Sequence, residues 1–187
     1  QWARLWSGDK SLRDPSYYKA GQTPDGVQRI TSANPVEGVD WPMSDQLLTR
    51  HRLVLPSEAQ WEYGCRGNTE TPYWCDAADL KDFANVADAT AKRASVPWTC
   101  ETWSDGHVVH APVGTFGANG FGLHDMHGNV WEWCRSLYGS SSNRVDRGGS
   151  FDMPTVNARS AYRNGNAGAF LNGNLGLRPA RTLRLRD

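Results

Sequence analysis

The stretch "GLHDMHGNVWEWC" (122–134) holds two tryptophans, two carboxylates, two histidines and a cysteine within thirteen residues. Acids, imidazoles and a thiol at this density fit a catalytic centre, a metal site or the polar struts of a loop-rich fold. Its last part, "VWEWC" (130–134), alternates in the way that predicts a strand, with Trp131 and Trp133 on one face. Because large aromatic side chains dominate core burial, we expect both rings to lie in the core.

The overall composition limits the classes of protein. The chain has 187 residues, the length of one domain, and carries 20 basic and 20 acidic side chains. No basic stripe indicates a nucleic-acid partner, since the short charged tail 181–187 is typical of a solvated chain end. No apolar run reaches the roughly 18 residues that a membrane span needs.

The start of the sequence indicates a piece of a longer protein. The first residue is Gln1 rather than Met, and no signal peptide is visible. Trp2, Leu5 and Trp6 have helical spacing and predict the end of a longer helix. No compartment follows from this, and the missing N-terminal part of the same chain is itself a candidate partner.

The usage of single residue types predicts a loop-rich fold. Nine Trp, 19 Gly and 10 Pro indicate a core built on a few large aromatic side chains. None of the cysteines forms a CxxC pair, which argues against a zinc knuckle. Free thiols and one disulfide both remain open for Cys65, Cys75, Cys100 and Cys134, of which the first two are the nearest pair.

Two segments predict helices with clear start signals. In 36–50 a short strand should precede a helix that Asp40 caps and that contains Pro42 in its first turn, where the missing amide costs nothing. A second helix is predicted within "LPSEAQWEYGCRG" (55–67), and Gly67 marks its end. Its capping box pairs Ser57 with Gln60, and its core-facing residues should be Ala59, Trp61 and Tyr63.

The rest of the chain is read as short strands between long loops. Strands are predicted at 107–113, 130–134, 143–151 and 175–181, and the paired glycines in 143–151 suit a bulge or a close backbone approach. The whole pattern predicts an α+β fold with two or three short helices, short antiparallel strands and little regular structure.

Five motifs in this order carry a family resemblance: "LPSEAQWEYGCRG", "APVGTFGANGFGLHDMHGNVWEWC", "RVDRGGSF", "ARSAYR" and "LGLRPAR". Together they resemble the formylglycine-generating-enzyme (sulfatase-modifying-factor) domain family over about 35–181. The resemblance implies a C-type-lectin-like fold that is often calcium-bound. It also implies that 1–187 is a single domain lacking the N-terminal strands usual in this family.

The resemblance implies three different functions. Some members oxidise a substrate cysteine to formylglycine with copper held by two cysteines, and others are iron-dependent sulfoxide synthases of ergothioneine synthesis. Still others bind ligands without catalysis, including the variable proteins of diversity-generating retroelements. Copper(I) needs soft thiolates, yet the segment after "RGGS", 151–163, contains Met153 and no cysteine. We therefore do not expect formylglycine generation, and the sulfoxide synthase is the enzymatic alternative.

The histidine pairs do not predict a metal centre. His107 and His110 lie three residues apart in an expected strand, which directs them to opposite faces. His124 and His127 flank a turn, and no third ligand accompanies them. An iron site would therefore need ligands from another domain.

Calcium is the cofactor that the resemblance implies. Calcium prefers hard oxygen ligands that mix carboxylates with carbonyls. The open alternative is that these side chains only cap turns, for which Asp and Asn are suited. The two implied ligand sets are Asn85, Val86, Asp105 and His107, and Asp125, Gly128, Val130 and Glu132, with Val86, His107, Gly128 and Val130 contributing carbonyls.

The chain departs from the family pattern in 152–174. Five of its eleven asparagines fall within 157–174, among Gly and Ala. This resembles a segment diversified by a retroelement, in which adenine-rich Asn codons are rewritten while the scaffold stays fixed. Short polar side chains on loops held by a rigid scaffold suit an adaptable binding surface, with Phe170 and Leu171 as apolar anchors. A Gly/Asn-rich turn region without a binding role is the open alternative.

These patterns predict a non-catalytic protein that binds a protein or cell-surface ligand. The stretch 122–134 then identifies the fold, because its acids are read as calcium ligands and its tryptophans as core. The expected ligand-binding residues are Asp152, Met153, Asn157, Asn164, Asn166, Ala169, Phe170, Asn172 and Asn174.

Overall fold

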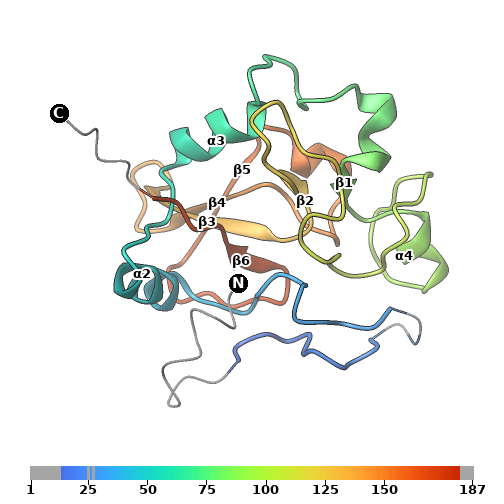
Figure 1. The fold of residues 1–187 in the computed structure, drawn as a ribbon, viewed down its shortest axis with the longest axis horizontal. Coiled ribbons are helices and arrows are strands. Elements are labelled where there is room, and N and C mark those ends of the chain that lie inside the picture. The colour runs from blue at the N-terminus through green and yellow to red at the C-terminus, as the bar shows by residue number, and fades with distance from the viewer. Residues whose placement is uncertain (1–13, 25, 27, 182–187) are drawn as a thin grey trace.

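The computed structural model describes residues 14–24, 26 and 28–181, so the helix expected at 1–7 lies outside the described residues. Short helices and strands, joined by long loops, surround a small central sheet (Figure 1). The predicted α+β class with short elements is confirmed. The elements are α2 (Trp41–Arg50), α3 (Glu58–Arg66), the 3₁₀-helix η1 (Ala77–Asp82), β1 (Ala84–Asn85), α4 (Ala89–Arg93), β2 (His127–Gly128), β3 (Trp131–Leu137), β4 (Arg144–Arg147), the 3₁₀-helix η2 (Thr155–Ala158), β5 (Arg163–Asn166) and β6 (Leu175–Leu177).

The central sheet has the strand order β5-β4-β3-β6. β4 pairs antiparallel with both β3 and β5, whereas β6 pairs parallel with β3. The strands predicted at 130–134, 143–151 and 175–181 are therefore confirmed; the first extends to Leu137, and the other two are shorter than predicted. A second, two-stranded sheet joins β1 and β2 in parallel, so the strands are not all antiparallel as expected.

Strand β3 is buried on both faces. Trp131 and Trp133 pack in one cluster with Leu48 of α2, while Cys134 packs in another cluster with Trp61 of α3. Figure 1 shows α2 and α3 on opposite sides of the sheet. The predicted core role of the tryptophans is confirmed, and their two clusters attach one helix to each face.

The predicted start and stop signals of both helices are confirmed. The Asp40 carboxylate accepts a hydrogen bond from the N–H of Met43 at 2.7 Å, which caps α2. Ser57 and Gln60 form the reciprocal capping box of α3, and Gly67 ends it in the left-handed conformation, with φ of +54°. These local signals fix where each helix begins and ends.

The buried face of α3 differs from the prediction. Trp61 and Cys65 are buried, four residues apart, whereas Ala59 is exposed and the Tyr63 residue is 70% exposed. Only the Trp61/Cys65 row can face the sheet, because residues i and i+4 share one side of a helix. The Tyr63 ring instead lies 5.2 Å from the ring of Phe121 at the surface.

The prediction of a strand at 107–113 is wrong. This segment is a loop, because its backbone groups find partners outside a sheet. The N–H of Ala111 donates to the side-chain oxygen of Asn129 at 3.0 Å, and the N–H of Val113 donates to the carbonyl of Ala33 at 2.8 Å. An asparagine side chain therefore replaces the neighbouring strand that the apolar pattern suggested.

The strand predicted before α2 reduces to a single bridge between Glu37 and Gly176. The buried Glu37 carboxylate accepts hydrogen bonds from the N–H groups of Tyr17 and Tyr18, both at 2.9 Å. This carboxylate attaches residues 17 and 18 to the segment that enters α2.

The paired glycines after β4 are used as predicted. Gly149 has φ of +79°, and a Cβ there would lie 3.0 Å from the Cα of Ala158. The predicted close backbone approach is thus confirmed. It lets β4 end directly against η2, where the segment that follows "RGGSF" begins.

Candidate functional site

The segment 152–174 leads from the end of β4 through η2 and β5 to β6 (Figure 1). It therefore contributes β5 to one edge of the sheet and then leads to β6 at the opposite edge. Its members fall into two groups that differ in burial and in hydrogen bonding.

Two of the asparagines bind an internal acid. Asn164 and Asn166 lie on β5, half-buried, and their amides donate to the carboxylate of Asp146 at 2.9 and 3.1 Å. Asp146 is fully buried on β4, and burial raises the pKa of its carboxyl to about 6, while the two amides act in the opposite direction. These two side chains hold the edge of the sheet.

A second internal bond closes the other end of the segment. The amide of the buried Asn174 donates to both oxygens of Asp152, at 3.1 and 2.9 Å, and the hydroxyl of Ser150 also donates to that carboxylate. Met153 packs, half-buried, against the cluster around Trp131. Asp152, Met153 and Asn174 are therefore occupied within the protein.

The turn at 167–172, hereafter the 167–172 turn, is exposed, as are Val156, Arg159, Ala161 and Arg163 elsewhere in the segment. Phe170 is 40% exposed, Leu171 is 46% exposed, and Ala169 and Asn172 are also exposed. Asn157, also a predicted ligand-binding residue, lies half-buried on η2. The structure thus separates an outward-facing group from the asparagines that brace the sheet.

Backbone hydrogen bonds hold the 167–172 turn at both ends. The N–H of Trp41 donates to the carbonyl of Gly168 at 2.9 Å, and the N–H of Gly38 donates to the carbonyl of Asn172 at 3.0 Å. Both donors belong to the region where α2 starts. The two apolar side chains are therefore presented outward from a backbone fixed to the scaffold.

The first expected calcium set comes together in the structure. Asn85 ends β1, and its amide lies 3.2 Å from the Asp105 carboxylate, which also accepts the N–H groups of Val86 and His107. The Asn85 side-chain oxygen is buried without a hydrogen-bond partner in the described part of the chain. An unsatisfied buried oxygen beside a half-buried carboxylate is chemically suited to a hard cation.

The charge around Asp105 points the same way. The fully buried Asp88 carboxylate accepts the N–H of Asp105, so two acids share this region. Burial, with Asp88 as a further cause, raises the pKa of Asp105 to about 8. No ion pair of Asp88 or Asp105 occurs within the described ranges.

The second expected calcium set is arranged differently. Both oxygens of Glu132 accept hydrogen bonds from Arg178, and its Oε2 atom also accepts the Nε1–H of Trp61 at 2.6 Å. Asp125 accepts the N–H of Gly114 through one oxygen, while its Oδ1 atom is buried without a partner in the described residues. Because an internal guanidinium neutralises Glu132, this set does not fit a cation as the first set does. Its expected carbonyl donors are Gly128, which ends β2, and Val130, which precedes β3.

Sequence reasoning did not predict the role of Arg178. The motif "LGLRPAR" contains it directly after the buried β6, where a charged side chain needs a partner. That position next to a buried strand was the available signal.

The four cysteines form no disulfide, and His127 is held inside the protein. All four cysteines are free, which resolves the open disulfide question. Burial raises the pKa of Cys65 to about 12 and also raises that of Cys134, so both remain thiols at neutral pH. His127 is buried between the carbonyl of Ala158 and the N–H of Trp74, and burial lowers its pKa to about 4. In the described residues, no three His, Cys, Asp or Glu side chains gather as a metal-binding group.

Comparison with known proteins identifies the family. The model of the sulfatase-modifying factor enzyme 1-like domain matches residues 10–183, and the chain belongs to this family. The chain is 30% identical over 176 residues to the formylglycine-generating enzyme of Streptomyces coelicolor, covering 79% of this chain and 52% of that enzyme. The chain thus spans about half the length of this curated relative.

Two solved structures show the same fold. Treponema denticola variable protein 1 superposes with a TM-score of 0.74 at 20% identity, covering 95% of this chain and 79% of that chain. PvdO from Pseudomonas aeruginosa superposes with a TM-score of 0.73 at 25% identity, covering 97% and 75%. The predicted C-type-lectin-like fold of the formylglycine-generating-enzyme type is confirmed. Over the residues that the structure describes, no helix is long and apolar enough to cross a bilayer.

Proposed function

We propose that the chain is a non-catalytic binding protein that recognises a protein or cell-surface ligand through the 167–172 turn. The observation that carries this proposal is the outward exposure of Phe170 and Leu171 on a backbone that α2 and its entry hold in place. Most large apolar side chains of the described residues pack in buried hydrophobic clusters. Two adjacent exposed ones on a fixed turn suit apolar anchors of a binding surface.

The proposed surface is narrower than the segment 152–174. Asn164, Asn166 and Asn174 are bonded to Asp146 and Asp152, so rewriting them would remove internal hydrogen bonds. In the part of the chain that the structure describes, positions 169–172 carry no comparable side-chain bond to a buried acid, so changes there should leave the scaffold intact. We therefore propose that ligand-specific variation is concentrated at 169–172.

The chemistry of the sulfurs supports binding rather than oxidation. The copper(I) chemistry that the family resemblance implies uses two cysteine thiolates, whereas 151–163 contains no cysteine. The Cys65 and Cys134 thiols are fully buried, with raised pKa values. The sulfoxide-synthase alternative has no supporting feature of its own among the described residues.

The coding DNA tests the proposal of diversification. A near-copy of the 3′ end of the gene, differing at adenines and adjacent to a reverse transcriptase gene, is expected. Its adenine differences should affect codons 169–172 and spare codons 164, 166 and 174. Absence of such a copy, or differences concentrated on the three internal asparagines, would contradict the proposal.

We further propose that calcium stabilises the scaffold at the first ligand set. Asn85 and Asp105 would contribute side-chain oxygens, with carbonyls of Val86 and His107. The support is the unsatisfied oxygen of Asn85, which lies near the half-buried Asp105 and the fully buried Asp88. Bound calcium would supply the positive charge that these acids lack. Titration with EGTA, followed by thermal melting, tests this proposal.

A further inference from the structure

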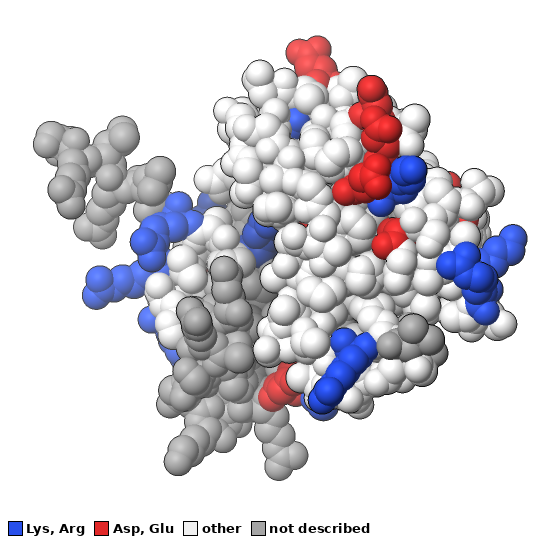
Figure 2. All heavy atoms as spheres, turned by 45° about the vertical axis from the view of Figure 1, so that its right-hand side comes forward, with Lys and Arg blue, Asp and Glu red and all other residues white. Residues whose placement is uncertain are grey.

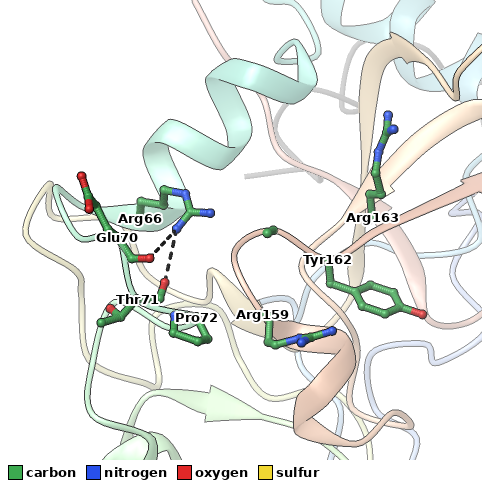
Figure 3. Close-up of a pocket in the computed structure, with 8 residues that line it drawn as sticks. Arg66, Glu70, Thr71, Pro72, Arg159, Tyr162 and Arg163 are labelled. Carbon is green, nitrogen blue, oxygen red and sulfur yellow. Dashed lines mark hydrogen bonds between the residues drawn. The ribbon is translucent and has the colours of Figure 1, made fainter.

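We propose that the chain carries a second binding site, a pocket that accepts the carboxylate of an acidic peptide side chain. The pocket has a volume of about 450 Å³ and lies between the end of α3 and the loop that connects η2 to β5. Figure 3 shows Arg66 reaching in from the helix, with Pro72 and Arg159 on the lower side of the pocket. This proposal is independent of the 167–172 turn.

Arg159 is the first reason for assigning an anion. Its side chain is exposed, and its Nε–H donates to the carbonyl of Val156 at 3.0 Å. In the described part of the chain, it makes no ion pair with an acid. In contrast, Arg163 pairs with Glu58 at 2.6 Å, and Figure 3 shows its guanidinium pointing away from Arg159. Arg159 therefore has its terminal nitrogens available to a ligand.

Arg66 supplies the second cation. Its Nε and NH2 groups bind Glu62 at 3.0 and 2.7 Å, whereas its NH1 group makes only long bonds, of 3.4 and 3.3 Å, to the carbonyls of Glu70 and Thr71. Such long bonds are weak, so this nitrogen can exchange them for a hydrogen bond to an anion that lies in the pocket. Both arginines line the pocket, and a planar guanidinium suits the oxygens of a carboxylate.

The local charge balance favours a single negative charge. Around the pocket four arginines, including the buried Arg147, face the three glutamates Glu58, Glu62 and Glu70. One positive charge is left over, which a monoanionic carboxylate neutralises and a phosphate dianion would exceed. Figure 2 shows charges of both signs spread over the face it presents, with no continuous basic surface. The charges around the pocket therefore suit a single carboxylate.

The walls favour a peptide side chain over a free ion. Pro72 and Ala161 line the pocket beside the guanidiniums and give it an apolar surface. A methylene stem can lie against them while the carboxylate meets the arginines. Partial exclusion of water strengthens such a pair, which in open solvent contributes little.

The test uses the full chain with arginine side chains labelled for NMR, and acetyl-Gly-Glu-Gly-amide as the probe. The Nε–H signal of Arg159 is expected to shift saturably with this peptide and to remain unchanged with the matched Gln peptide. Arg159→Gln should weaken binding, followed through the Arg66 signal, about tenfold, as expected for loss of a charge-assisted hydrogen bond. Arg135→Gln, which changes an exposed arginine on β3, is the control and should bind as the wild type.

A second variant tests the pocket without changing Arg159, in case Arg159→Gln disturbs the local fold. Ala161→Glu leaves both arginines intact and places a tethered carboxylate at the exposed mouth of the pocket. It should fold normally and no longer bind the Glu peptide. Equal shifts with the Glu and Gln peptides, unchanged binding by the Ala161→Glu variant, or tighter binding of inorganic phosphate than of the Glu peptide would overturn the assignment.

Discussion

Arg178 binds both carboxylate oxygens of Glu132, at 2.7 Å from Oε1 and 2.8 Å from Oε2. Glu132 lies on β3 between the two core tryptophans, and the Nε1–H of Trp61 donates to the same carboxylate. One ion pair therefore connects the chain beyond β6 with the central strand and with α3. It also explains why the acid in "VWEWC" is compatible with a buried strand.

Removal of the cation should destabilise the protein strongly. Arg178→Met leaves a mostly buried carboxylate without its counter-charge, and we expect the free energy of unfolding to fall by about 3 kcal/mol. Urea denaturation followed by tryptophan fluorescence measures this change. The double variant Glu132→Gln with Arg178→Met should recover part of the loss. A single variant within about 1 kcal/mol of the wild type would mean that the pair is not needed.

The two asparagines on β5 should affect stability rather than binding. Asn164→Ala with Asn166→Ala removes both amide donors from the buried Asp146 carboxylate. We expect a loss of about 2 kcal/mol in the free energy of unfolding, since each bond to a buried group typically contributes about 1 kcal/mol. Asn172→Ala is the matched control, because that side chain is exposed, and it should leave stability unchanged. Equal stability of the double variant and the control would disprove the bracing role.

Asp146 should also make stability depend on pH. Burial raises the pKa of its carboxyl to about 6 in the folded state, above the value of about 3.9 in an unfolded chain. The folded state therefore favours the protonated form. The contribution of this group to stability is fully present below about pH 4 and is lost as the pH rises to about 6. The change amounts to roughly 3 kcal/mol.

Urea unfolding at pH 4.5 and pH 6.5 checks this contribution. Asp146→Asn keeps a neutral group in place at both pH values. The unfolding free energy at pH 6.5 minus that at pH 4.5 should therefore be about 2 kcal/mol more positive in the variant than in the wild type. If wild type and variant respond to pH identically, Asp146 is not the titrating group.

The calcium proposal predicts a specific response to a chelator. With calcium present at about 100 times its dissociation constant, the bound ion would add about 2.7 kcal/mol. EGTA should then lower the melting temperature by roughly 5–10 °C. Asp105→Asn should remove this response, whereas Asp125→Asn, in the second set, should retain it. An unchanged melting temperature of the wild type in EGTA would argue against a structural ion.

The sequence predicted features that depend on neighbouring residues. The caps at Asp40 and Ser57 and the stop at Gly67 are local hydrogen-bond and backbone effects, and the alternation at 130–134 marks a buried strand in the same way. The order of the five motifs predicted the fold family, but it did not predict which strands pair with one another.

Features that depend on distant contacts were not predictable in this way. β5, with the sequence "RNGN", has little strand propensity and forms because β4 supplies its ladder and Asp146 binds its asparagines. The segment 107–113 reads as a strand, yet a distant asparagine satisfies its backbone. For the same reason, the sequence does not distinguish the asparagines that bind buried acids from those on the exposed 167–172 turn. Only the burial of each side chain in the structure separates the two groups.

The most direct measurement of the binding function is photo-cross-linking in the native host cells. The photoreactive residue p-benzoylphenylalanine is placed at position 170 or, as a control, at the exposed Tyr63 on α3. Position 170 should give one discrete adduct. Excess wild-type chain should compete this adduct away, whereas excess Phe170→Ala/Leu171→Ala chain should not. Position 63 should give no such adduct. A discrete adduct from position 63 alone, or equal competition by the double variant, would contradict recognition through the 167–172 turn.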